Sequence, residues 1–467
     1  MNIEQIYTGC LAQGAYYIES NGEVAIIDPL RESQPYIDRA NKDNAQIKYI
    51  FETHFHADFV SGHLTLSKQT GAEIIFGPNA ETSYSATIAK DNQEFKLGNI
   101  IIKAIHTPGH TMESTTYLLI DKDNKNHAIF SGDTLFIGDV GRPDLAQKTG
   151  ELSETDLAGL LYDSLRNKIM TLEDDVIVYP AHGAGSACGK NMSKETTGTI
   201  GEQKKSNYAL RADMSKEEFI KEVTDGLLPP PAYFPQNVKM NQEGYDDVDT
   251  IIKRGTKAFS ADEFEQKANE SGAIILDVRH QNDFVTEHIP RSIFIGIDGG
   301  FAPWVGALIA DVTQKILLVT PEGREEEVIT RLSRVGFDNT IGYLKGSFNS
   351  WKKSGKETDF LRSITAEEFA NEKEDTKIFD VRKTTEFESS HITNAINTPL
   401  SELNNYLENY KSEKTSYIHC AGGYRSVIAG SILKSRGIHN ITDVKGGFGA
   451  IKNTNIQLTD FECPSKI

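Results

Sequence analysis

The sequence predicts an α/β protein of three domains. An internal repeat, alternating strand-like and helix-like segments, and metal-type side chains placed where predicted strands end all lead to this prediction. At 467 residues the chain exceeds the usual size of a single domain. Its 25% of charged and 9% of aromatic residues are typical of folded proteins and not of disordered ones.

Charge, hydropathy and cysteine content narrow the range of partners and compartments. With 49 Lys and Arg against 67 Asp and Glu, the net charge is −18, so we expect neither nucleic acid nor an anionic membrane as a partner. We find no apolar run long enough to span a bilayer, and the acidic start MNIEQIYTGC does not read as a secretory signal. Four scattered cysteines without a Cys-x-x-Cys pair predict a reducing, cytoplasmic location.

The C-terminal half contains two copies of one unit. ILDVRHQNDFVTEHIP (275–290) matches IFDVRKTTEFESSHIT (378–393), and each has a His eleven positions after the Asp of Asp-Val-Arg. Short β-branched runs such as KILLVT and TSYIHC alternate with amphipathic stretches, which predicts parallel sheets. We place the first copy at 258–358 and the second at 359–467, after a linker at 241–257.

Residues 1–240 do not share this repeat and are predicted to form a larger domain. YYIESNGEVAIIDP predicts a β-hairpin, because Asn21-Gly22 supplies the positive-φ turn. Further strand-like runs are KYIFETH, EIIFGP, NIIIKAIH, STTYLLID, HAIFSGD and DVIVYPAH, with helical stretches between and after them. The Pro-rich GLLPPPAYFP (226–235) ends the domain and leads into the linker.

Metal-type side chains stand just past several of these predicted strands. They are His54, His56 and Asp58 after KYIFET, His110 in TPGHT, Asp133 in SGDT and His182 in YPAH. Loops at strand ends can bring distant side chains to one point, which a metal requires. A lone histidine is most simply structural, but several such elements at strand exits favour a metal site.

The pattern resembles the metallo-β-lactamase fold, an αββα sandwich, over about residues 1–235. The family's His-x-His-x-Asp-His motif stands here as His54-Phe55-His56-Ala57-Asp58-Phe59. In the dinuclear zinc hydrolases of this family, such as glyoxalase II, the missing last His holds the second metal. Because the Phe59 side chain cannot ligate, a single metal is favoured.

The ligand types indicate which metal to expect. Two His and one carboxylate with open positions is the arrangement of non-haem Fe(II) oxygenases. His54, His110 and Asp133 match the residues that hold iron in persulfide dioxygenases of this fold. The resemblance therefore implies one Fe(II) per chain, bound by these three side chains.

The same resemblance gives supporting roles to three further residues. His56 matches a position that ligates zinc in the hydrolases, so it is either a fourth ligand or a group behind the ligands. Asp58 and His182 would orient water or substrate around the metal.

Arg142 and Cys188 each leave two interpretations open. Arg142 lies in GDVGRPDL, which resembles a Gly-Arg-x-Asp segment of the dioxygenases. It forms either a structural ion pair with Asp144 or a contact with an anionic persulfide. Cys188, in GAGSACG, is either a packed small hydrophobe or a thiol that stages or senses persulfide sulfur.

In the last domain, strand TSYIHC runs into a cysteine loop that opens a helix. The loop consists of Cys420, Ala421, Gly422, Gly423, Tyr424, Arg425 and Ser426. Backbone N–H groups backed by a helix N-terminus form an anion cradle and favour a thiolate nucleophile. This resembles the active loop of rhodaneses, which are sulfurtransferases, over about residues 360–460. Cys-based phosphatases place five residues between Cys and Arg; four stand here, which favours a sulfane sulfur on Cys420 over a phosphoryl group.

The first copy of the repeat lacks this chemistry. It reads LLVTPEGREEEV, with Thr320-Pro321 at the expected cysteine position. Without a thiol no covalent sulfur carrier can form, so this domain is predicted to dock its neighbours or to form a contact in a homo-oligomer, either a dimer or a tetramer.

Together the three domains resemble bacterial fusions that clear sulfide-derived persulfides. The resemblance implies oxidation of a low-molecular-weight thiol persulfide by O2 to sulfite and free thiol. Cys420 would then pass a second sulfane sulfur to sulfite, giving thiosulfate. Two alternatives remain: a dinuclear zinc thioester hydrolase of the glyoxalase II type with accessory rhodanese domains, and a non-catalytic persulfide sensor or sulfur carrier. The sequence does not say which thiol carries the persulfide.

Overall fold

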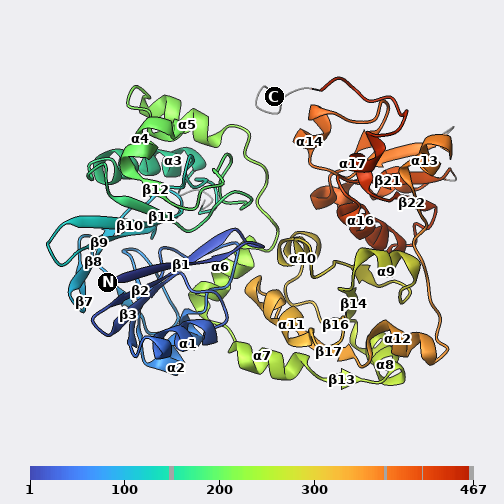
Figure 1. Ribbon diagram of the computed structural model, residues 1–467, viewed down its shortest axis with the longest axis horizontal. Coiled ribbons are helices and arrows are strands. Elements are labelled where there is room, and N and C mark those ends of the chain that lie inside the picture. The colour runs from blue at the N-terminus through green and yellow to red at the C-terminus, as the bar shows by residue number, and fades with distance from the viewer. Residues whose placement is uncertain (147–151, 373–375, 413, 462–467) are drawn as a thin grey trace. The chain divides into compact units, whose positions relative to one another are not determined.

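The computed structural model describes residues 1–146, 152–372, 376–412 and 414–461 (Figure 1). The chain divides into two compact units, one of residues 1–250 with 332–336 and one of residues 251–331 with 337–467. None of the helices in these described ranges is both long enough and apolar enough to cross a bilayer.

Two six-stranded sheets form the centre of the first unit. The first sheet has the order β1 (Asn2–Thr8), β2 (Gln13–Ser20), β3 (Glu23–Ile27), β4 (Gln46–Phe51), β5 (Glu73–Phe76) and β6 (Thr87–Ile88). The second has the order β12 (Gly198–Thr199), β11 (Ile177–Pro180), β10 (Asn126–Gly132), β9 (Thr115–Ile120), β8 (Ile100–His106) and β7 (Glu94–Leu97). The predicted strand runs therefore all form strands, and β3 to β6 are parallel.

The predicted hairpin joins β2 and β3. Ser20 pairs with Glu23, so only Asn21 and Gly22 lie in the turn, with φ of 53° and 81°. Two consecutive positive φ angles give a turn whose twist matches that of the flanking strands.

Helices cover the outer face of each sheet, and the two inner faces pack on each other. Tyr16 and Phe51 from one sheet share a buried core with Tyr117 and Phe130 from the other. The first sheet packs on α1 (Gln34–Lys42) and α2 (His63–Thr70). The second packs on α3 (Glu154–Ser164), η1 (Leu165–Ile169), α4 (Ile200–Ser206), η2 (Tyr208–Leu210) and α5 (Lys216–Thr224). The predicted αββα sandwich is thus confirmed.

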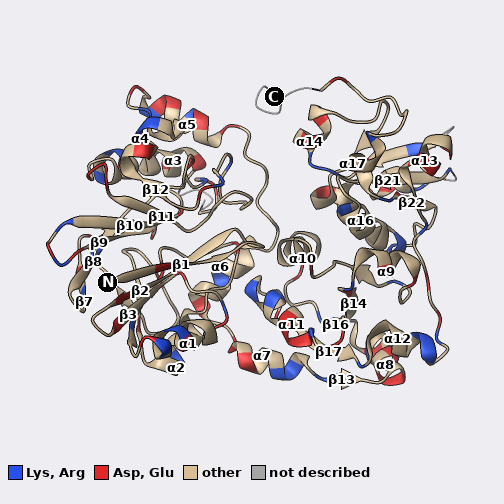
Figure 2. Cartoon of the chain, viewed as in Figure 1, with Lys and Arg blue, Asp and Glu red and all other residues tan. Residues whose placement is uncertain are grey.

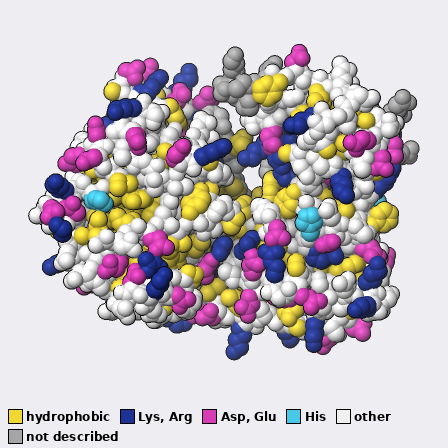
Figure 3. All heavy atoms as spheres, in the orientation of Figure 1, with side chains coloured by type: hydrophobic (Ala, Val, Ile, Leu, Met, Phe, Trp, Pro, Cys, Tyr) yellow, Lys and Arg dark blue, Asp and Glu magenta, His cyan; other side chains and the backbone are white. Residues whose placement is uncertain are grey.

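The segment predicted as Pro-rich tail and linker is helical over much of its length. It contains α6 (Phe234–Glu243) and α7 (Val248–Gly255), and α6 begins with a proline in its first turn, where the missing N–H has no helical partner to lose. Figure 2 shows acidic and basic residues at opposite ends of α7, as the helix dipole favours. On the face drawn in Figure 3, acidic and basic side chains are interspersed.

The second unit repeats one parallel five-stranded sheet. The first copy has the order β13 (Ala258–Phe259), β17 (Thr340–Leu344), β16 (Ile316–Val319), β14 (Ile274–Asp277) and β15 (Ile293–Phe294). The second has the order β18 (Ser363–Ile364), β22 (Ile441–Val444), β21 (Ser416–His419), β19 (Lys377–Asp380) and β20 (Ile396–Asn397). The two orders are the same, as the sequence repeat predicts.

Short helices connect these strands in each copy. In the first copy they are α8 (Ala261–Ser271), α9 (Gln281–Thr286), α10 (Phe301–Leu308), α11 (Glu325–Arg334) and α12 (Ser347–Lys353). In the second they are α13 (Ala366–Glu372), α14 (Thr384–Ser389), η3 (Leu400–Tyr406), α15 (Leu407–Tyr410), α16 (Tyr424–Ser435) and α17 (Gly447–Ile451).

The repeated Asp-Val-Arg motif is part of the scaffold in both copies. Arg279 pairs with the buried Asp277 at 2.7 Å, and Arg382 pairs with the buried Asp380 at 2.6 Å. The repeated histidine is structural as well, because the Nδ1 of His288 lies 2.7 Å from the carbonyl oxygen four residues earlier. These contacts explain why the motif persists in a copy that has no cysteine.

Candidate metal centre and cysteine loop

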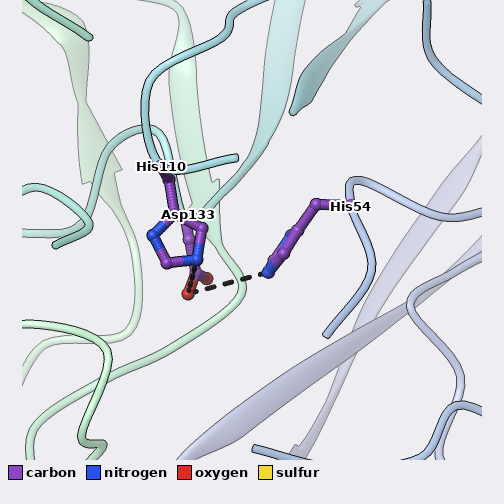
Figure 4. A group of neighbouring side chains, drawn as sticks. All are labelled: His54, His110 and Asp133. Carbon is purple, nitrogen blue, oxygen red and sulfur yellow. Dashed lines mark ion pairs between the residues drawn. The ribbon is translucent and has the colours of Figure 1, made fainter. Parts of the chain in front are cut away.

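Three of the predicted ligands converge on one point in the first unit. His54 lies just past β4, Asp133 directly follows β10, and His110 lies in the loop between β8 and β9. His110 Nε2 is 3.4 Å and His54 Nε2 is 3.9 Å from Asp133 Oδ2, and Figure 4 shows both rings turned toward that oxygen. All three side chains are buried.

Hydrogen bonds behind the two histidines leave their Nε2 atoms free. The Thr53 hydroxyl donates to Asp28 Oδ2 at 2.8 Å, so its oxygen can accept the Nδ1–H of His54 at 3.0 Å. The Nδ1–H of His110 donates to the backbone carbonyl of Arg142 at 2.8 Å, since a carbonyl can only accept. In both rings, therefore, Nε2 carries the lone pair that a metal needs.

The buried atoms of this group fit a metal ion. His54 Nε2 and Asp133 Oδ2 have no hydrogen-bond partner, which is costly for buried polar atoms unless something else satisfies them. Burial and the neighbouring His56 hold the pKa of His54 well below its usual value, so the ring is neutral, as ligation requires. Two imidazoles and one carboxylate suit Fe(II) as well as zinc.

His182 bridges two carboxylates beside this group. Its Nδ1 lies 2.8 Å from Asp133 Oδ1 and its Nε2 lies 2.9 Å from Asp58 Oδ2. Burial disfavours the charged imidazolium, but the two carboxylates outweigh burial and raise the pKa of His182 well above its usual value. Both ring nitrogens of His182 are therefore engaged, and this side chain fixes the second oxygen of Asp133.

His56 lies beside His54, with ring centroids 4.2 Å apart, but it groups with Asp28 and Glu52 and not with the three predicted ligands. Its Nε2 lies 3.1 Å from Asp28 Oδ1 and 3.6 Å from Glu52 Oε2, but neither of its ring nitrogens has a hydrogen-bond partner. Phe59 is fully buried and stacks on the His56 ring, with centroids 4.3 Å apart. Burial and the neighbouring Asp28 raise the pKa of Glu52 well above its usual value. The sequence analysis did not identify Glu52 as a residue of this site.

Arg142 supports the centre from behind. Its guanidinium pairs with both oxygens of Asp144 at 2.6 Å and donates to the Ala187 and Leu228 carbonyls. Its backbone carbonyl orients His110, and its backbone N–H donates to the Cys188 carbonyl at 3.0 Å. The structure thus shows the ion pair of the first interpretation.

Cys188 is buried against the carboxylates of the centre. Its thiol lies within 4.8 Å of the ligating atoms of Asp58 and His182. Burial and the nearby carboxylates raise the pKa of Cys188 well above its usual value, which favours the protonated thiol. Tyr233 is also buried, and burial, followed by the nearby Asp58 and Cys188, raises its pKa well above its usual value. The Pro-rich sequence around Tyr233 gave no sign of this position.

Asn241 of α6 holds the loop that carries His56 and Asp58. Its amide nitrogen donates to the His56 and Phe59 carbonyls at 2.8 and 2.9 Å, and its amide oxygen accepts the Ser61 N–H at 2.9 Å. Asn237 lies one turn earlier on the same helix, is equally buried, and has no hydrogen-bond partner for either amide atom. Sequence reasoning missed Asn241, because a buried amide does not register as an apolar helix face.

The cysteine loop of the second unit forms as predicted after β21. Cys420 is buried, and its sulfur accepts the Gly423 N–H at 3.1 Å and the Ser426 hydroxyl at 3.5 Å. Gly423 has φ of 95°, which suits glycine and lets the chain turn into α16. The two hydrogen bonds hold the sulfur in place beside the start of α16.

Arg425 is held at the rim of this loop. Its two terminal nitrogens pair with both oxygens of Glu386 at 2.7 and 2.8 Å. A second chain segment crosses the loop closely, because a Cβ on Gly447 would lie 2.2 Å from the Cys420 carbonyl oxygen. Arg425 is therefore engaged with Glu386, and the hydrogen-bond donors to the sulfur are the Gly423 N–H and the Ser426 hydroxyl.

Strand register places a threonine at the equivalent position in the first copy. Asp380 pairs with His419, which precedes Cys420, and Asp277 pairs with Val319, which precedes Thr320. Thr320 therefore occupies the place of Cys420. Its hydroxyl donates to the Pro321 carbonyl at 2.6 Å.

Two family models match different parts of the chain. A metallo-β-lactamase superfamily model matches residues 8–182, and a rhodanese-like domain model matches residues 260–354 and 365–454. The chain is similar to a solved metallo-β-lactamase from Staphylococcus aureus subsp. aureus COL, with 29% sequence identity and a TM-score of 0.64. The match covers 74% of this chain and 98% of the solved chain.

Curated relatives of the first domain carry out two different reactions. A cytoplasmic hydroxyacylglutathione hydrolase of Arabidopsis thaliana is 33% identical over 138 residues, or 28% of this chain; the chain spans about half (53%) of that protein. The mitochondrial persulfide dioxygenase of Homo sapiens is 29% identical over 211 residues, 45% of this chain and 74% of that protein.

The contacts of Asn241 predict that Asn241→Ala weakens metal binding. Without the amide, two carbonyls and one N–H of the loop lose their partner, and groups behind metal ligands typically contribute about 10–100-fold in affinity. Asn237→Ala is the matched control, because it removes an equally buried amide that has no hydrogen bonds. Metal affinity by competition with a chelator, together with Tm of the metal-free proteins, compares the two; equal affinities would contradict the assignment.

Proposed function

Because the chain carries a metallo-β-lactamase-fold domain followed by two rhodanese-like domains, we propose that it oxidises low-molecular-weight thiol persulfides with O2 and passes further sulfur to the product. The first domain would yield sulfite and free thiol, and the last would convert sulfite to thiosulfate. The persulfide, O2 and sulfite are thus its proposed small-molecule partners, and the removal of excess persulfide is its proposed role.

The observation that carries this proposal is a ligand set for one metal. His54, His110 and Asp133 present three atoms to one point. Asp58, His182 and Cys188 form a neighbouring buried group whose ligand types could also hold a metal ion. In that group, however, each ring nitrogen of His182 bonds a carboxylate, and a buried phenyl ring, Phe59, stands at the last position of the motif. Two His and one carboxylate around a single metal support Fe(II) over a dinuclear zinc centre.

When bound, Fe(II) supplies redox capacity and open coordination positions at this site. The protein holds the ligand rings in one tautomer through Thr53 and the Arg142 carbonyl. Burial of the ligands excludes bulk water from the site and strengthens its electrostatic interactions. The overall reaction balances as RSSH + O2 + H2O → RSH + SO3²⁻ + 2 H⁺.

Sulfur transfer would take place at Cys420. Its thiolate attacks the outer sulfur of a second persulfide, the S–S bond of that persulfide breaks, and the thiol leaves as RS⁻. Sulfite then attacks the outer sulfur on Cys420, the new S–S bond breaks, and the electron pair returns to the Cys420 thiolate as thiosulfate departs. The Gly423 N–H and the Ser426 hydroxyl stabilise the thiolate at both stages.

Metal analysis and a substrate panel test the first step. Purified without oxygen, the chain is expected to hold close to one iron and to consume O2 only with a persulfide. His110→Ala and Asp133→Ala should each lose iron and turnover, because each removes one of three ligands. Asp58→Asn is the matched control, since it alters a neighbouring carboxylate outside the three and should keep one iron.

Two zinc ions per chain in the unaltered protein, with fewer zinc ions bound in Asp58→Asn, would contradict the mononuclear account. Hydrolysis of S-lactoylglutathione by the zinc-loaded protein would then favour the thioester hydrolase. Protein that binds no metal would instead favour the sensor or carrier alternative.

Cys420→Ser tests the second step. A hydroxyl stays protonated near pH 7 and cannot carry a sulfane sulfur, whereas the iron ligands lie in a separate domain. O2 uptake is therefore expected to continue while sulfite accumulates in place of thiosulfate. Chromatography of the sulfur oxyanions at short times, against a no-enzyme control, measures the ratio. Thiosulfate as the main product above that control would show that the transfer takes place elsewhere.

A further inference from the structure

The two rhodanese-like domains, both in the second unit, contact each other where α16 begins. Tyr424, the first residue of α16, donates its hydroxyl to the Gly296 carbonyl at 2.7 Å. Its ring meets Phe294 edge-on, with centroids 5.9 Å apart. About two turns further along α16, the Ser431 hydroxyl oxygen accepts the Phe294 N–H at 2.9 Å. The copy without a cysteine therefore holds the helix that follows the cysteine loop.

Glycines in the inactive copy make room for the Tyr424 ring. A Cβ on Gly299 would lie 2.3 Å from Cζ of Tyr424, and one on Gly296 would lie 3.2 Å from its Cε2. Real Cβ atoms do not approach a ring atom as closely as the first distance, so any side chain at position 299 would displace Tyr424. We name residues 296–299 the tyrosine seat.

Tyr424 is directly bonded to the residue that contacts the sulfur. Gly423 precedes it and donates its N–H to Cys420 Sγ, and Arg425 follows it and is fixed on its other side by Glu386. A shift of the Tyr424 ring, which is hydrogen-bonded to Gly296, can therefore be passed through one peptide bond to the Gly423 N–H. Displacements of about 1 Å at a reacting group can cost up to about a hundredfold in rate.

We propose that the inactive rhodanese-like domain positions the sulfur-carrying loop of its neighbour through the tyrosine seat, with Tyr424 as the positioning residue. The domain that lost its thiol then has a defined task in sulfur transfer. This inference rests on the proposed sulfurtransferase activity of Cys420 and gives the reason for retaining a second, cysteine-free copy.

Gly299→Ala in the full chain tests the seat without altering the active domain. It should lower kcat/KM for sulfur transfer from thiosulfate to cyanide by about tenfold or more. Gly300→Ala is the matched control, because its added Cβ would meet Trp304 of its own domain at 3.3 Å and not Tyr424. It should leave kcat/KM within about twofold.

A second pair of variants keeps the test independent of steric crowding. Tyr424→Phe removes only the hydroxyl that bonds Gly296, and it should lower kcat/KM in the same direction. Tyr417→Phe removes a hydroxyl of the same domain that bonds Glu372 and should have no such effect.

The last readout separates positioning from general destabilisation. If Gly299 acts through the ring, Gly299→Ala should add no further loss in a Tyr424→Leu background. The alkylation rate of Cys420, followed by peptide mass spectrometry, should change in Gly299→Ala while that of Cys10 in the other unit does not. Additive losses, or equal kcat/KM in Gly299→Ala and Gly300→Ala, would overturn the inference. Sulfur transfer that persists in Cys420→Ser would instead overturn the proposed function on which it rests.

Discussion

The centre of the first domain is organised by one constraint: each ligand histidine has two nitrogens, and the one that faces away from the metal must be given a fixed partner. Thr53 serves His54 and the Arg142 carbonyl serves His110. Asp133 follows the same rule, because His182 takes one oxygen and leaves the other free. Most of the buried polar residues around the centre can be understood as supports of this arrangement.

The supports come from elements that are distant in the sequence. Asp28 at the end of β3 holds Thr53, the loop after β10 supplies Arg142, and α6 supplies Asn241. Only the folded sandwich brings these segments to the same edge of the two sheets. The metal site therefore depends on the fold of the whole domain, including the buried core between the two sheets.

In the second unit, by contrast, the fold is the same whether or not the nucleophile is present. Both copies keep the same strand order and the same buried Asp-Arg pair, so the scaffold does not depend on the chemistry that it carries. The two copies differ at the position of the nucleophile, where one copy has Cys420 and the other Thr320. Retaining a scaffold without a nucleophile is understandable if its surface has a use, and the contact with Tyr424 provides one.

Sequence patterns predicted the strands, the hairpin at Asn21-Gly22 and the placement of His54, His110 and Asp133, because each depends on local periodicity or on residues at strand ends. They could not predict Asn241 or Tyr233, whose burial follows from the way α6 and the Pro-rich segment fold back. They also left Arg142 open, since its role depends on partners far along the chain.

Anomalous diffraction from crystals of the protein purified and loaded with metal without oxygen, recorded at the iron and zinc edges, tests the central claim most directly. The account predicts one iron peak within bonding distance of His54 Nε2, His110 Nε2 and Asp133 Oδ2, with His182 still between Asp58 and Asp133. Two zinc peaks, the second ligated by Asp58 and His182, would contradict it.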